Sequence, residues 1–158
     1  MHSIKNILVS TLLLTFTLVG CQEVAEGLIK VKGVNNLDAV TQVIEQLDYK
    51  IVPLATALGS KSVFLDPGDG KEKIAFEFAT NTCMLVLITH NKSTQDLDIL
   101  FSERRSGIFT KTSAEHYQEL TKAIEFLFGK NQVNAEDISG KVRENFVRPP
   151  NACEAKNA

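Results

Sequence analysis

The sequence has no tryptophan, only two tyrosines and no excess of one charge, with 17 basic against 19 acidic residues. Scarce aromatic rings disfavour a platform on which bases stack. The formal net charge of −2 leaves no basic field that would capture nucleic acid. Apolar residues make up 44% and charged residues 23%, which excludes disordered, collagen-like and coiled-coil chains. A length of 158 residues suits one globular domain.

The N-terminal region lacks an apolar run long enough to cross a bilayer, which takes about 20 residues. Lys5 supplies a positive charge, and residues 7–19 that follow are uncharged and mostly apolar. This order is typical of a secretory signal peptide rather than of a transmembrane helix. We therefore expect residues 1–20 to be absent from the mature protein.

The end of this region carries the most specific motif of the chain. Leu18-Val19-Gly20-Cys21 resembles the lipobox of bacterial lipoproteins, and the resemblance covers the first 21 residues only. It implies cleavage before Cys21, a diacylglyceryl thioether on its sulfur and an acylated new N-terminus, which together anchor the chain to a membrane. Asp commonly follows the cysteine in Gram-negative lipoproteins kept in the inner membrane. Gln22 stands there instead, which implies an outer-membrane anchor facing the periplasm if the source is Gram-negative.

Three cysteines are an odd number, but assigning Cys21 to the lipid leaves the pair Cys83 and Cys153. Export places both in an oxidising compartment, where a disulfide is allowed. That bond would close a loop of about 70 residues, stabilise the fold by about 4 kcal/mol and tie the C-terminal tail to the sheet. The alternative is a buried free Cys83 with a disordered Cys153.

Motifs and apolar spacing predict four parts of the chain: a signal peptide (1–20), a lipidated tether (21–27), one domain (28–148) and a C-terminal tail (149–158). Apolar spacing and capping residues predict three helices: 36–47 with Asn36 as N-cap, 112–129 with a capping box of Thr112 and Glu115, and a weaker one at 134–146. Alternating apolar and polar residues, or short apolar runs, predict strands at 28–32, 62–65, 74–79, 83–88, 97–101 and 107–110. Short turns join most of these strands, which favours antiparallel pairing. The expected fold is an α+β two-layer sandwich with about four or five strands in a mainly antiparallel sheet and helices on one face.

Groups of polar residues do not form a recognisable metal, cofactor or nucleophile motif. Asp66, Asp69 and Gly70 surround Pro67 and suit a hairpin turn better than a calcium loop. Cys83 and His90 are an odd number of residues apart on one strand, so they face opposite sides of a sheet. His90 and His116 remain after cleavage and lack zinc-ligand spacing. We expect no metal and no cofactor.

Two polar groups invite a functional reading. Asp96 and Asp98 share one strand face, and Glu103 is nearby in sequence. This pattern suits the solvent-exposed side of a sheet better than the carboxylate pair of a glycosidase. Arg104 and Arg105 are expected at a hairpin tip, where they would bind an acidic partner or lipid headgroups, or serve solubility alone.

The sequence therefore predicts an envelope lipoprotein whose periplasmic domain is a non-catalytic protein-binding module of assembly, inhibitor or immunity type. The contact is expected on the open sheet face, around Asp66–Gly70 or at Arg104 and Arg105. One alternative is an envelope hydrolase with a scattered site, such as one formed by His90, Asp98 and His116. Another is a carrier of small apolar ligands, which needs a cavity between sheet and helices.

Overall fold

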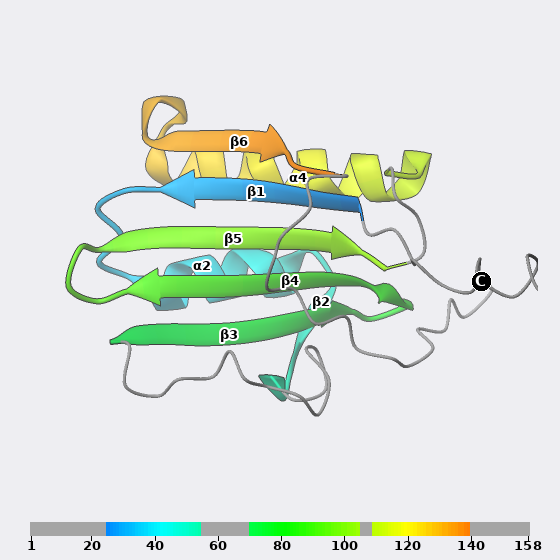
Figure 1. Cartoon of the computed structure of the whole chain (residues 1–158), viewed down its shortest axis with the longest axis horizontal. Coiled ribbons are helices and arrows are strands. Elements are labelled where there is room, and N and C mark those ends of the chain that lie inside the picture. The colour runs from blue at the N-terminus through cyan, green and yellow to red at the C-terminus, as the bar shows by residue number, and fades with distance from the viewer. Residues whose placement is uncertain (1–24, 55–69, 105–108, 140–158) are drawn as a thin grey trace, which may run out of the picture.

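The computed structural model describes residues 25–54, 70–104 and 109–139, which form one antiparallel sheet with two helices against it. The sheet has six strands, and both helices lie behind it in the view of Figure 1. In chain order the elements are β1 (Ala25–Val31), α2 (Leu37–Gln46), β2 (Tyr49–Val52), β3 (Lys71–Phe78), β4 (Asn81–Asn91), β5 (Asp96–Glu103), α4 (Lys111–Phe128), the 3-10 turn η1 (Lys130–Gln132) and β6 (Val133–Asp137). The expected two-layer α+β sandwich is confirmed.

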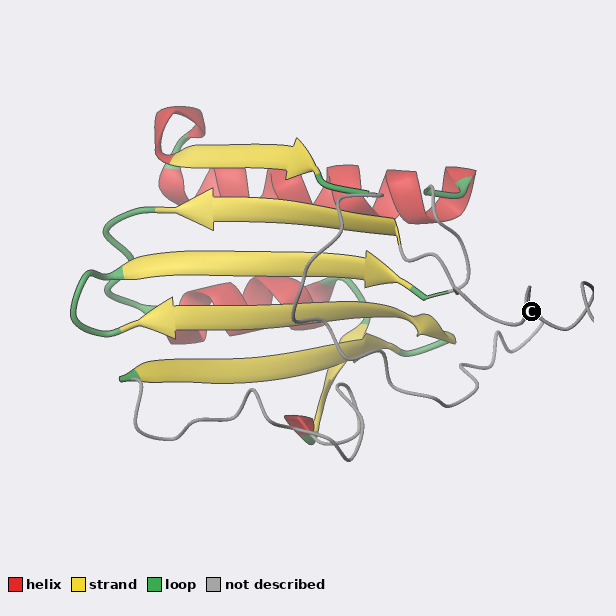
Figure 2. Ribbon diagram, in the orientation of Figure 1, coloured by secondary structure: helices red, strands yellow, loops and turns green. Residues whose placement is uncertain are grey.

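The strands lie in the order β2-β3-β4-β5-β1-β6, with every neighbouring pair antiparallel. The three strands from β3 to β5 are joined by tight turns, as expected for neighbours in the chain. β1 enters between β5 and β6, although both come later in the sequence (Figure 2). The strand predicted at 28–32 is present as part of β1, but its predicted edge position was wrong, because β1 begins at Ala25 and is paired on both sides.

Each helix begins at a side chain that accepts a backbone hydrogen bond. The Asn36 carboxamide accepts from Ala39 N–H at 3.2 Å, which confirms the predicted start of α2. The Thr110 hydroxyl accepts from Ser113 N–H at 3.2 Å, so α4 begins earlier than the expected capping box at Thr112. Residues 109 and 110 consequently lead into α4 and do not form the strand predicted at 107–110.

The C-terminal part of the described chain corrects a further prediction. Residues 133–137 form β6, where the sequence favoured a helix over 134–146. β6 pairs with β1 from Val31 to Gly27 and satisfies backbone groups of β1 that would otherwise form the sheet edge. The sequence signal for the helix was weak, and this long-range pairing overrides it.

Side chains from the sheet and both helices fill the layer between them. The central cluster is Ile29, Val31, Val34, Val40, Ile44, Tyr49, Phe76, Met84, Val86, Ile88, Leu97, Ile99, Phe101, Leu120 and Ile124. Residues of this cluster recur at alternate positions along β4 and β5, which fixes the face that each strand turns toward the helices. No helix within the described ranges is long and apolar enough to span a membrane.

Several predictions fall outside the described residues. They are the signal peptide and Cys21, the strand at 62–65, the turn residues Asp66 and Asp69, Arg105, Cys153 and the tail 149–158.

Candidate binding surface

The sheet face turned away from α2 and α4, here called the open face, carries an apolar row that the sequence did not reveal. Residues aligned in neighbouring strands form this row: Leu28, Leu100, Leu87, Ala75 and Val52. Along their own strands, Leu100 alternates with the central cluster together with Asp98, and Ala75 does so together with Glu77. Only the register between strands shows that these side chains are neighbours.

A polar row and a mixed row flank the apolar row. The polar row holds Lys30, Asp98, Thr89 and Lys73 and lies toward the end of the sheet at which β1 finishes. The mixed row holds Glu26, Ser102, Leu85, Glu77 and Lys50 and lies toward the end at which β1 begins. We call these ends the far end and the anchor end, because Cys21, at which the sequence predicts a lipid anchor, precedes β1 in the chain.

Exposure divides the open face into two halves. Lys30 and Asp98 are exposed in the polar row, and they are directly opposed across β1 and β5. Toward the anchor end, Leu100 is 7%, Ser102 7% and Glu26 6% exposed. The wet sheet side expected around Asp96 and Asp98 is therefore present, but only at the far end.

Arg104 lies in the turn that follows β5 at the anchor end. Its N–H donates to the Cys83 carbonyl at 3.0 Å, and its side chain is half-buried. Burial lowers the pKa of the guanidinium, while the negative charge of Glu77 opposes that shift. The described residues contradict the expectation that Arg104 sits at a hairpin tip, because residues 109 and 110 lead into α4 and form no strand.

Glu103 does not face the same side as Asp96 and Asp98. Its buried carboxylate accepts hydrogen bonds from Thr110 N–H at 3.1 Å, from the Thr110 hydroxyl at 3.3 Å and from the Ser113 hydroxyl. A carboxylate is favoured at this position because a helix N-terminus presents free N–H groups and the positive end of the helix dipole. Glu103 therefore holds the start of α4 against the sheet and does not form a carboxylate pair with the two aspartates.

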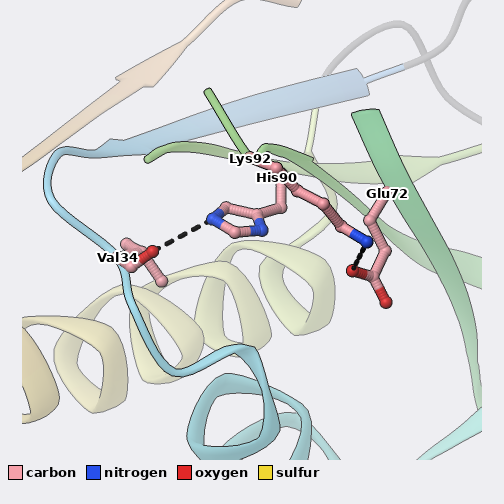
Figure 3. Close-up of polar contacts among 4 residues, drawn as sticks. All are labelled: Val34, Glu72, His90 and Lys92. Atoms are coloured by element: carbon pink, nitrogen blue, oxygen red, sulfur yellow. Dashed lines mark hydrogen bonds and ion pairs between the residues drawn. The ribbon is translucent and has the colours of Figure 1, made fainter. Parts of the chain in front are cut away.

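His90 lies in β4 on the helix-facing side of the sheet, near the far end. Its Nε2 lies 3.0 Å from the Val34 carbonyl oxygen, so the ring donates from Nε2 (Figure 3). Its Nδ1 is buried and has no hydrogen-bond partner among the residues that the structure describes. The hydrogen bond from His90 to Val34 thus ties β4 to the loop between β1 and α2. On the surface nearby, Lys92 pairs with Glu72 at 3.2 Å.

His116 occupies the opposite end of the domain. Its ring packs on Phe78 with centroids 4.4 Å apart, and Tyr49 lies beside Phe78 at 5.1 Å. The Tyr49 hydroxyl is buried and has no hydrogen-bond partner in the described part of the chain. Burial, together with the negative charge of Glu119, raises the pKa of Tyr49. His116 thus belongs to an aromatic cluster between α4 and the ends of β2 and β3.

The three residues proposed for a scattered hydrolase site do not come together. His90 faces the helices at the far end, Asp98 is exposed on the open face, and His116 lies in α4 near the anchor end. No group of three or more histidine, cysteine or acidic residues in the described ranges is arranged to hold a metal ion. Cys83 is buried at the start of β4, and its predicted disulfide partner Cys153 lies outside the described ranges.

Comparison of the chain with models of protein families, with curated proteins and with solved structures gave no match.

Proposed function

We propose that this protein is a bacterial envelope lipoprotein, anchored through Cys21, whose domain binds a protein partner close to the membrane. The observation that carries the proposal is the position of β1. This strand is internal to the sheet and begins at Ala25, only four residues after Cys21. The expected tether of residues 21–27 is therefore shorter than the sequence suggested.

The short tether sets the distance between membrane and fold. Four residues span at most about 14 Å when fully extended. A lipid on Cys21 would hold the anchor end of the sheet close to the headgroups, and the far end would point into the aqueous space. Confinement of this kind raises the effective concentration of the domain for partners at the same membrane.

The exposed half of the open face is the contact surface that we favour. Lys30 and Asp98 stand opposite one another on two paired strands, so their backbone positions are fixed before a partner arrives. Opposed charges on a rigid surface give an interface specificity, because a partner must match both signs at once. The apolar Leu28 and Leu87, both half-buried, border these charges and offer area for hydrophobic contact.

Two alternatives receive less support. The hydrolase hypothesis needs His90, Asp98 and His116 in one site, and they lie on different faces and ends of the domain. The carrier hypothesis needs a cavity between sheet and helices, and that layer is filled by the central cluster of side chains. The binding hypothesis requires neither feature.

Lipidation is tested first, by intact-mass analysis of the protein purified from bacterial membranes. The expected mass corresponds to a chain that begins at Cys21 and carries acyl chains, and the Cys21→Ser variant should lose them and leave the membrane fraction. A mature protein that retains residues 1–20, or an unmodified Cys21, would overturn the anchor.

Binding is tested in cells with a photoreactive amino acid placed at Asp98 and, as control, at Lys122. Both positions are exposed, but Lys122 lies on α4, on the helix side of the domain. Irradiation should give a discrete cross-linked protein from position 98 and none from position 122, and the Cys21→Ser background should weaken the product. Equal products from both positions, or none from position 98, would argue against a partner on the open face.

A further inference from the structure

The strand β6 forms one edge of the sheet, and β1 is the only described strand that pairs with it (Figure 1). The residues of β6 from Asn134 to Asp137 are all exposed. Natural sheets commonly blunt an edge with a proline, and Pro53 directly follows β2 at the opposite edge. β6 contains no proline, so its edge is the more open of the two to a further strand.

The register between β1 and β6 determines which backbone groups of β6 point toward the sheet. Ile138 N–H donates to the Glu26 carbonyl at 2.8 Å, so the backbone groups of these two residues face each other. In an antiparallel ladder, pairs of this kind recur at every second residue. Asn134 and Glu136 therefore turn their N–H and carbonyl groups toward β1.

The alternate residues of β6 turn their backbone groups toward the outer edge. They are Val133, Ala135 and Asp137. The Val133 N–H already donates to the Lys130 carbonyl, which leaves the N–H groups of Ala135 and Asp137 on the outer side together with the carbonyl groups. No hydrogen bond within the described ranges uses these outer groups. Donors and acceptors in this alternation are what an added strand pairs with.

We propose that β6 binds an extended segment of the partner protein as a further strand of the sheet, with a basic residue of that segment beside Asp137. Asp137 is exposed at the anchor end of β6 and follows the acidic Glu136, so this end of the edge favours positive charge. Lys130 is exposed before β6 at the far end and favours an acidic residue there. Opposite charges at the two ends of the segment set its direction and register along β6.

A segment on β6 lies next to the charged half of the open face. Asn134 stands beside Lys30 in the register, and Lys30 stands opposite Asp98. A side chain of the added strand opposite Asn134 therefore extends this polar row by one position. The inference rests on the proposed function in assuming that the domain binds a protein, and it names how one segment of that protein is held.

A second copy of this chain fits the edge less well than a different protein does. Antiparallel pairing of two β6 strands turns the two anchor ends in opposite directions, an arrangement that two chains anchored in one membrane could not adopt. Parallel pairing in register sets Asp137 beside Asp137 and Glu136 beside Glu136. Like charges side by side on neighbouring strands are unfavourable. An extended segment of a different protein meets neither obstacle.

The direction of the backbone groups is tested first, by amide hydrogen exchange of the purified mature chain followed by NMR. The amides of Ala135 and Asp137 should exchange about tenfold faster or more than those of Asn134 and Glu136, because only the latter two donate to β1. Slow exchange at Ala135 and Asp137 would show that their N–H groups are already bonded, and it would reject the proposal.

Binding at the edge is tested in cells with a photoreactive amino acid at Asn134. Ala135→Pro removes an outward N–H that β1 does not use, whereas the matched control Ala135→Val keeps it. Irradiation should give a discrete cross-linked protein from the unchanged chain and from Ala135→Val, and about tenfold less or lower from Ala135→Pro. Circular dichroism should report the same fold for both variants. Equal yields from the two variants would reject pairing through the backbone.

The charge on the segment is tested with Asp137→Asn, which keeps an acceptor for Ser139 N–H, now 2.8 Å from the Asp137 carboxylate, and removes the negative charge. The yield from position 134 should fall about two- to fivefold. Glu119→Gln on the exposed side of α4 is the control and should leave the yield unchanged. An undiminished yield in Asp137→Asn would reject the basic residue beside Asp137.

Two further outcomes of the cross-linking would overturn the proposal in different ways. A product with twice the mass of the mature chain would assign the edge to a second copy. A product from position 98 with none from position 134 would reject the contact at β6 and leave the proposed function standing, whereas the absence of products at both positions would count against the proposed function as well.

Discussion

The ring of Tyr117 in α4 lies directly on the backbone of Gly27 in β1. A Cβ atom at position 27 would stand 2.4 Å from Cε2 and Cζ of that ring. The Tyr117 hydroxyl shares its single hydrogen between the Glu136 carbonyl oxygen at 3.0 Å and the Leu28 carbonyl oxygen at 3.3 Å, which places it across β1 and β6. Glycine at position 27 is therefore required by the close approach of α4 to the sheet.

Gly27→Ala should destabilise the domain by about 1–3 kcal/mol, because the ring must move away from both carbonyls. Urea unfolding monitored by circular dichroism measures this change. The control is the same substitution in a Tyr117→Ala background, where the obstructing ring is absent and the added cost should fall below about 1 kcal/mol. Equal costs in the two backgrounds would show that the ring is not what excludes a side chain at position 27.

Tyr49 and Tyr117 should respond in opposite directions to loss of their hydroxyl groups. Tyr49→Phe removes a buried hydroxyl that no described residue hydrogen-bonds, so the free energy of unfolding should stay unchanged or rise by about 1 kcal/mol. Tyr117→Phe removes a donor used by two carbonyl oxygens and should lower the free energy of unfolding by about 1 kcal/mol. Thermal melts of the two variants provide the comparison, and a larger loss for Tyr49→Phe would contradict it.

Alkaline pH should weaken the fold through the same two tyrosines. Burial, followed by the negative charge of Asp137, raises the pKa of Tyr117 to about 12 from an ordinary value of 10.0. The unfolded chain therefore loses this proton at lower pH than the folded protein, so stability is full below pH 10 and falls as pH rises from 10 toward 12. Tyr49 shifts in the same direction. A pH series of urea unfolding should show a shallower alkaline decline for Tyr117→Phe than for the unchanged protein.

The sequence predicted local features of this fold better than long-range ones. Asn36 as the cap of α2, the end of the second helix near residue 129 and the strands at 83–88 and 97–101 followed from neighbouring residues. The insertion of β1 between β5 and β6 could not be predicted in this way, since no periodicity reports which distant strands pair. β6 was mistaken for a helix for the same reason.

The candidate surface shows the same division. Alternation correctly placed Asp96 and Asp98 together on one face of β5. Glu103 is close to them in sequence only: it faces the helices and caps α4 through Thr110 and Ser113, a role that depends on a helix beyond β5. The apolar row on the open face depends on the alignment of strands from distant parts of the chain, and that register is a tertiary property.

Glu103→Gln should destabilise the start of α4. The amide keeps the size of the side chain but loses the negative charge that accepts from Thr110 and Ser113, and its NH₂ group meets donors instead of acceptors. We expect a loss of about 1–3 kcal/mol in the free energy of unfolding. Glu119→Gln, an exposed position on the same helix, is the control and should change stability by less than about 0.5 kcal/mol. Equal effects of the two substitutions would remove the special role of Glu103.

Charge reversal should separate structural from recognition roles on the open face. Arg104→Glu places a negative charge in a half-buried position close to Glu77, so we expect the free energy of unfolding to fall by about 1–3 kcal/mol.

Asp98→Lys reverses an exposed charge and should change the free energy of unfolding by less than about 0.5 kcal/mol. Its effect should appear instead in binding, because two lysines would then face one another across β1 and β5 and a partner suited to opposite charges would meet one sign only. The readout is the yield of the cross-linked product from a photoreactive residue at Thr89, the neighbour of Asp98 on β4. Restoring opposite charges with Lys30→Glu in the same chain should leave the yield low, since the order of the charges is then inverted. Recovery of the full yield would mean that the pair supports the sheet and does not recognise the partner.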